Sequence, residues 1–154
     1  MAEPPAGRVR KTAFPSMRRV VVPVVHGCAA PAALDLALAR APEVVLIGMV
    51  RVGPDEILSA AVTKAREVRK SLRQLVVEAS GRARARARVL VSDAPWVELQ
   101  RSLRNVNPDL LVLEWPAHFR AMGAEVDAIL GTSPCDTAIV RGPLPRPARR
   151  VLVP

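Results

Sequence analysis

Aromatic residues are scarce in this chain: they make up 3% of the sequence, and tyrosine is absent. A hydrophobic core must therefore be built from aliphatic side chains. These are plentiful, since half of the 154 residues are hydrophobic. This length and composition suit one domain, or one domain with tails.

Cysteine is also rare, and Cys28 and Cys135 lie far apart in the sequence. Two isolated cysteines provide neither a disulfide framework nor a metal cluster. No apolar run approaches the ~20 residues that a membrane helix needs, and the N-terminal residues contain arginines and prolines but no hydrophobic signal segment. We therefore expect a soluble protein of the reducing cytoplasm, without membrane insertion.

Acidic residues are too few to balance the basic ones, so the net charge is +9. Residues 1–19 hold five basic residues and one acidic residue, and residues 141–154 hold four basic residues and no acidic one. Residues 20–140 are nearly neutral, with 14 basic and 13 acidic residues. The excess basic charge thus lies in the two ends, which argues against nucleic acid as a partner of the folded part.

Short aliphatic runs alternate with helical patterns along the chain. Strands are predicted at about 20–25, 43–52, 87–91, 110–113 and 138–140. The longest helix is predicted from a start at 53–56 to Ala79, and a further helix from 122 to 130. Strands that alternate with helices five times over predict an α/β fold with three αβα layers and a parallel sheet.

Arginine alternates with alanine from Arg82 to Arg88. In an extended conformation all four guanidinium groups would project from one face. A sheet covered on both faces cannot bury four unpaired charges, so this strand is predicted to be short, from about Ala87 to Val91, and to lie at a sheet edge. A solvated edge is the favoured interpretation, and an anion or nucleic-acid contact is the alternative.

An open parallel sheet binds ligands beyond the carboxyl ends of its strands. The turn from Glu114 to Gly123 follows the fourth strand and is expected to line this crevice. His26 and His118 lie near it and could serve as zinc ligands or as acid and base. Nothing in their spacing supports such a site, so we interpret them as loop residues.

Trp115 and Phe119 follow the same strand. They predict either an apolar lid over the crevice or structural packing against Val25 and its neighbours. Gly131-Thr132 looks like a phosphate-binding pair, but it stands at the end of a predicted helix, where the backbone amides face the negative pole of the dipole. We interpret Gly131 as a helix-terminating residue and expect Cys135, in the following turn, to be packed.

Four segments share a pattern with one family of α/β domains: RRVVVPV at 18–24, the long helix after the second strand, VSDAPWVELQRSLRNVNPDLLVLE at 91–114, and MGAEVDAILGTSPCDTAIVRG at 122–142. In the last segment Gly123 lies eleven residues before Pro134-Cys135, a spacing that this family shows. The chain thereby resembles the universal stress protein domain over residues 17–142. The resemblance implies a Rossmann-like sheet of five parallel strands in the order 3-2-1-4-5 and, commonly, a homodimer through the last strand.

ATP-binding members of that family wrap the phosphates with glycine-rich backbone. Their pattern is a glycine after the fourth strand, a second after two residues, and Gly-Ser or Gly-Thr after nine more. Here Glu114 and Ala117 stand in the first two places, and the stretch is about four residues shorter. Gly123 remains, but Ala124 replaces the hydroxyl residue. Val25 stands where the binding members have an acid.

A carboxylate at the mouth of a phosphate site repels the ligand by roughly a few kcal/mol. We therefore expect no cofactor, with ATP as the alternative; if a nucleotide does bind, Gly123 and Ala124 are expected to donate to its phosphates. The expected role is non-enzymatic, in stress response or regulation, through self-association or partner binding. The alternative is an adenine-nucleotide sensor, related to regulatory modules on bacterial transporters.

Residues 1–16 mix prolines, glycine and charges without periodicity and are predicted to be disordered. The segment ARRVLVP at 148–154 nearly copies MRRVVVP at 17–23. We interpret 17–142 as the domain and 143–154 as a Pro/Arg-rich tail. This tail either begins a second tandem domain or supplies a strand that pairs with a second subunit.

Overall fold

A computed structural model of the chain describes residues 17–25 and 30–143. Strands and helices alternate in the order β1 (Arg19–Val25), α1 (Pro31–Arg40), β2 (Glu43–Arg51), α2 (Leu58–Ala79), β3 (Arg84–Ser92), α3 (Pro95–Val106), β4 (Leu110–Glu114), α4 (Ala117–Met122), α5 (Val126–Thr132) and β5 (Asp136–Val140). The extension predicted to be disordered, His26, Cys28 and the segment 148–154 lie outside the described residues.

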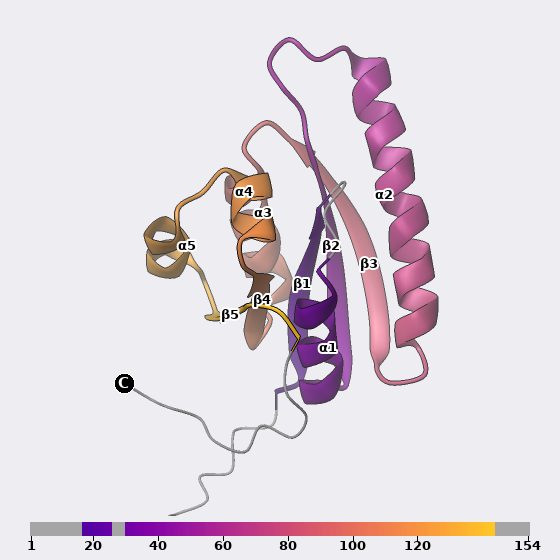
Figure 1. The fold of residues 1–154 in the computed structure, drawn as a ribbon, viewed down its shortest axis with the longest axis vertical. Coiled ribbons are helices and arrows are strands. Elements are labelled where there is room, and N and C mark those ends of the chain that lie inside the picture. Colours follow the sequence, from indigo (N-terminus) through magenta and orange to yellow (C-terminus); the bar gives the residue numbers. More distant parts are fainter. Residues whose placement is uncertain (1–16, 26–29, 144–154) are drawn as a thin grey trace, which may run out of the picture.

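The five strands form one parallel sheet in the order β3-β2-β1-β4-β5. Helices α1 and α2 cover one face, and α3, α4 and α5 cover the other, so the sheet lies between two helical layers (Figure 1). The predicted three-layer α/β architecture, the strand order and the Rossmann-like class are confirmed. Aliphatic residues fill both cores, as the shortage of aromatic residues requires.

Pro23 lies within the central strand β1, on the side that faces β4, where the pairing is short. The Asp109 N–H donates to the carbonyl of Arg19 (2.9 Å), so the odd-numbered residues of β1 turn their backbone groups toward β4. Pairing with β4 covers only Val20 and Val21. The missing N–H of Pro23 therefore points to a place where the ladder has already ended.

Strand β3 is longer than predicted. It spans nine residues and pairs with β2 along its whole length, instead of covering only 87–91. Its position at the sheet edge is confirmed, and solvent there explains how the arginines are accommodated. The four arginines do not share one face, however: Arg82 precedes the strand and pairs with Asp35 of α1 (3.3 Å), whereas Arg86 pairs with Glu43 of β2 (3.3 Å).

The single helix predicted from 122 to 130 is two short helices. Gly123 adopts a left-handed conformation (φ 63°) that ends α4, and Glu125 is extended before α5 begins. Met122 and Ile129 are buried, but Leu130 is 49% exposed. The apolar spacing thus predicted Met122 and Ile129 correctly, whereas Val126 is only half-buried and the prediction for Leu130 was wrong. The break at Gly123 depends on one backbone conformation.

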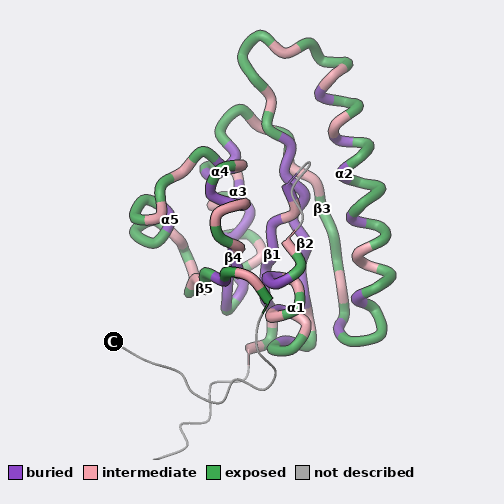
Figure 2. Tube along the Cα trace, in the orientation of Figure 1, coloured by how far each residue is buried: buried purple, intermediate pink, exposed green. Residues whose placement is uncertain are grey.

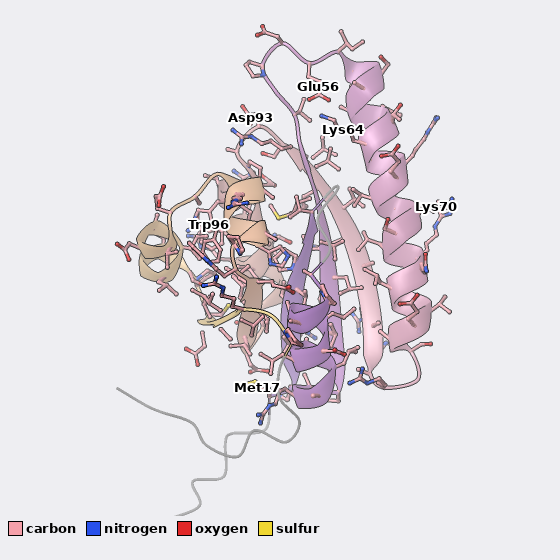
Figure 3. All side chains as sticks on the ribbon, in the orientation of Figure 1. Met17, Glu56, Lys64, Lys70, Asp93 and Trp96 are labelled. Atoms are coloured by element: carbon pink, nitrogen blue, oxygen red, sulfur yellow. The ribbon has the colours of Figure 1, made fainter. Side chains whose placement is uncertain are left out.

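Helix α2 begins at Leu58, later than predicted, because residues 53–56 form a turn. The Glu56 N–H donates to the Gly53 carbonyl (3.1 Å), and the Glu56 carboxylate accepts from the Gly53 N–H (3.1 Å). Lys64 Nζ lies 2.7 Å from Glu56 Oε1 and ties this turn to the helix (Figure 3). None of the described helices combines the length and apolarity needed to cross a bilayer.

Candidate functional site

The carboxylate of Glu114 caps helix α1 from the end of β4. Its Oε2 accepts hydrogen bonds from the N–H groups of Ala32 (3.0 Å) and Ala33 (3.2 Å). Helix α1 has no capping side chain of its own, because Ala30 stands at the N-cap and Pro31 at the first helical position. Glu114 therefore supplies both the acceptor and the negative charge that a helix start requires.

His118 lies directly below this contact and is fully buried (0% exposed). Its Nδ1 accepts a hydrogen bond from the Glu114 N–H (2.9 Å), so the neutral ring carries its proton on Nε2. Nε2 has no hydrogen-bond partner among the described residues. Burial lowers the pKa of His118 to about 4, and the backbone carbonyl of Pro23 acts in the opposite direction. The interpretation of His118 as a loop residue is wrong, because it lies in α4 and points into the core.

The turn expected between Glu114 and Gly123 is largely filled by α4. Phe119 (6% exposed) and Met122 (3%) pack with Val25 at the end of β1. Trp115 is 39% exposed, and its ring lies against Phe119 with a centroid distance of 5.1 Å and an interplanar angle of 53°. Of the two predicted roles, structural packing describes Phe119. Trp115 is instead partly exposed and forms one wall of the neighbouring pocket.

A pocket of about 370 Å³ opens beside this wall, between α4 and α5. Gly123 and Ala124, predicted to contact a nucleotide, both line it, together with Trp115, Phe119 and Arg120. Glu114 is turned instead toward α1, so the structure divides the predicted site residues between two places.

Arg51 is a residue at this site that sequence analysis missed. It ends β2, and its guanidinium lies 3.2 Å from the place where a side chain on Gly123 would begin. A side chain at 123 is thus disfavoured both by the left-handed backbone and by Arg51. The available signal was a basic residue at the carboxyl end of a strand, where this sheet type binds ligands.

The other candidate residues, Cys135, Gly131 and Thr132, lie in packed or helical positions outside the pocket. Cys135 is half-buried against the core of α3, α4 and α5, as expected, and burial raises the pKa of its thiol. Gly131 and Thr132 lie in the last turn of α5, so their place at a helix end is confirmed. Gly131 does not terminate the helix, however, because α5 continues to Thr132 and ends at the extended Ser133. Among residues 17–25 and 30–143, no three His, Cys, Asp or Glu side chains come close enough to hold a metal ion.

Together these elements define an open, parallel α/β domain with a pocket between α4 and α5, in the segment that follows β4. Comparison with solved structures narrows this class. A universal stress protein family member from Burkholderia pseudomallei superposes with a TM-score of 0.64 at 19% identity, covering 82% of this chain and 98% of that one. This chain therefore has the universal stress protein fold.

Two further structures share the fold and carry a nucleotide. A universal stress protein from Archaeoglobus fulgidus in complex with dAMP has a TM-score of 0.56 at 16% identity, covering 79% of this chain and 96% of that one. An Arabidopsis thaliana universal stress protein family protein with AMP bound has a TM-score of 0.55 at 13% identity, covering 80% and 91%. No family model matches the sequence. No curated protein matches it either.

Proposed function

We propose that this chain is a non-enzymatic, cytoplasmic domain of the universal stress protein type that acts in stress response or regulation through self-association or partner binding. In this proposal it binds ATP weakly or not at all. The observation that carries it is the Glu114 carboxylate at the start of α1. A negative group already occupies the positive end of that helix, so an incoming phosphate meets a like charge instead of free N–H groups.

Two features of α4 support the absence of catalysis and of a phosphate-binding loop. His118, Phe119 and Met122 fill the space beneath the crevice with buried side chains. With a pKa of about 4 and no exposed atoms, His118 is also a poor general base at neutral pH.

The alternative is an adenine-nucleotide sensor. Structures of this fold hold dAMP and AMP. Arg51 beside Gly123 provides a cation at the crevice mouth, and no carboxylate among the described residues forms an ion pair with it within the usual distance. In this reading Arg51 and the amides of Gly123 and Ala124 bind the phosphates.

Changing Glu114 separates the two candidates. In the wild type, isothermal titration with ATP at micromolar concentration is expected to give no saturable heat. Glu114→Gly restores a glycine at the motif position and frees the N–H groups of Ala32 and Ala33. Its melting temperature should start lower and then rise on addition of millimolar phosphate or ATP, whereas the wild-type value should not move. Saturable ATP binding to the wild type would favour the sensor.

Glu114→Gln tests the capping role itself. The amide oxygen can still accept from α1, but the charge that complements the helix dipole is lost. The free energy of unfolding should fall by about 1 kcal/mol in urea titrations. Glu125→Gln is the matched control, since Glu125 stands at the N-cap of α5 without a side-chain hydrogen bond and its loss should have little effect.

Self-association is proposed to use β5, the strand at the sheet edge opposite to β3. This strand pairs only with β4 among the described residues, and Ile139 is 38% exposed on it. Ile139→Lys should shift sedimentation from dimer toward monomer. Val97→Lys changes a more exposed side chain (53%) on α3 and should leave the dimer intact. Equal behaviour of the two variants would exclude β5 as the interface.

A further inference from the structure

A second concave surface lies at the β3 edge, far from the crevice residues just described. We call it the α2–β3 groove: five residues of α2 between Arg69 and Val77 form one wall, and Ala85–Val89 of β3 forms the other. Its volume is about 680 Å³. Helix α2 and β3 lie side by side at this edge (Figure 1), and β3 is coloured as exposed or half-buried over most of its length (Figure 2).

The backbone of β3 is available for pairing on its outer side. The Arg84 N–H donates to the Pro42 carbonyl (2.8 Å), and the Ser92 carbonyl accepts from Val52 (3.0 Å). Even-numbered residues of β3 therefore turn their backbone groups toward β2. The groups of Ala85, Ala87 and Val89 turn outward, and β3 pairs with no strand there among the described residues. This is a regular, nine-residue template for one more strand.

The arginine–alanine alternation creates the hollow beside this template. Val89 packs with the core under α2, whereas Leu90 packs with the core under α3, so odd-numbered residues of β3 face α2. Ala85 and Ala87 are too small to fill the space to the helix. The opposite wall is apolar, with Val76 half-buried and Val77 72% exposed. Apolar side chains from an added strand would fit between these walls.

The rim of the groove is strongly basic. Four arginines line it, two from α2 and two from β3, and no carboxylate is among the lining residues, although Arg86 also pairs with Glu43 of β2 (3.3 Å). Arg69 and Arg73 are one helical turn apart on α2. Arg88 approaches Ser102 of α3 (3.3 Å), which places the β3 arginines on the sheet face away from α2. A strand added to β3 would thus meet apolar surface on one face and guanidinium groups on the other.

We propose that the α2–β3 groove binds an extended, acidic segment of a partner protein by adding it to the sheet as a further strand. The segment alternates acidic residues, which face Arg86 and Arg88, with apolar residues, which face Val76 and Val77. The ends of this chain do not fit the charge, since residues 1–16 and 144–154 carry six basic residues and one acidic residue. This inference deepens the proposed role in partner binding, and it uses the edge opposite to β5.

Fluorescence anisotropy with a labelled nine-residue peptide, the length of β3, tests the inference. The probe alternates glutamate with valine or leucine and is measured against the full chain. One control peptide has the same composition with all glutamates at one end, and another carries N-methyl groups on alternate amides to remove strand pairing. We expect micromolar binding of the alternating peptide that weakens with salt, and at least tenfold weaker binding of both controls.

Two protein variants locate the site. Arg88→Glu should weaken binding about tenfold, because Arg88 lies on the face that meets the acidic residues. Arg104→Glu, the same change at an exposed position of α3, should leave binding unchanged. Ala87→Pro removes an outward N–H that the sheet does not use, so the fold should be retained while binding is lost. Circular dichroism and thermal melting verify that each variant is folded.

Equal binding of the N-methylated peptide, wild-type affinity in Arg88→Glu, or full competition by a single-stranded oligonucleotide would overturn the inference. Sedimentation of the Ile139→Lys variant tests the β5 dimer independently of the peptide. If the dimer is lost while the peptide still binds, the two associations use different edges; if the wild type binds no peptide but forms the dimer, only the groove proposal fails.

Discussion

Acidification from pH 7 to pH 4 is expected to lower the free energy of unfolding by about 3 kcal/mol through His118 alone. The ring has no exposed atoms, and burial moves its pKa from 6.5 to about 4. The unfolded chain binds a proton at this position near pH 6.5, but the folded chain does so only near pH 4. The stability that depends on the neutral ring is therefore complete above pH 6.5 and is lost as the pH falls toward 4, at about 1.4 kcal/mol per pH unit.

Urea titrations between pH 7 and pH 4.5 measure this effect. His118→Gln keeps an acceptor for the Glu114 N–H but cannot titrate, so its stability should be lower at pH 7 and nearly independent of pH in this window. Arg19 lowers the pKa of both Glu43 and Asp109, and these carboxyl groups start from 4.5 and 3.8. The stability that depends on these carboxylates begins to fall only at the acid end of the window, and it does so equally in variant and wild type, so it cancels in the difference between the two pH curves. Parallel pH curves for variant and wild type would refute the assignment to His118.

Replacing Gly48 with valine should destabilise the domain by about 3 kcal/mol, although valine is the better strand former. Gly48 lies in β2 beneath α2. A Cβ there would stand 2.5 Å from Val68 Cγ1 and 2.7 Å from Leu72 Cδ1, so helix and sheet would have to separate. Thermal and urea unfolding would measure the loss.

Two comparisons isolate the steric cause. Gly53→Val introduces the same side chain where nothing lies within 4 Å, and it should change the stability by no more than about 0.5 kcal/mol. Adding Leu72→Ala to Gly48→Val should cost less than the two changes do separately, because the shortened side chain makes room. Strict additivity of the pair would argue that the effect of Gly48→Val has another origin.

The sheet was predictable because the strands β1, β2 and β4 are continuous runs of mainly aliphatic residues. The edge strand was placed correctly but made too short. Arginines need not leave the strand to reach water, because an edge position already exposes Arg84 and Arg86 within it. The backbone of β3 therefore stays paired with β2 along this stretch without burying the arginine side chains.

The site was harder to predict for two physical reasons. The buried positions of α4 are 118, 119 and 122, a helical spacing that is hidden when the first residue is a histidine. The second reason is distance along the chain: Glu114 and Ala32 are 82 positions apart, and no local pattern links an acid to the helix start that it caps. That the carboxylate opposes phosphate stays a prediction, and its structural partner on α1 became visible only in three dimensions.

The Glu114 carboxylate also bears on how such a domain would be regulated in a cell. A crevice that carries its own anion needs no small molecule to complete its folding. In the proposed function its stability would then stay constant when adenylate levels fall, and regulation would come through the proteins proposed to bind at the β3 and β5 edges of the sheet.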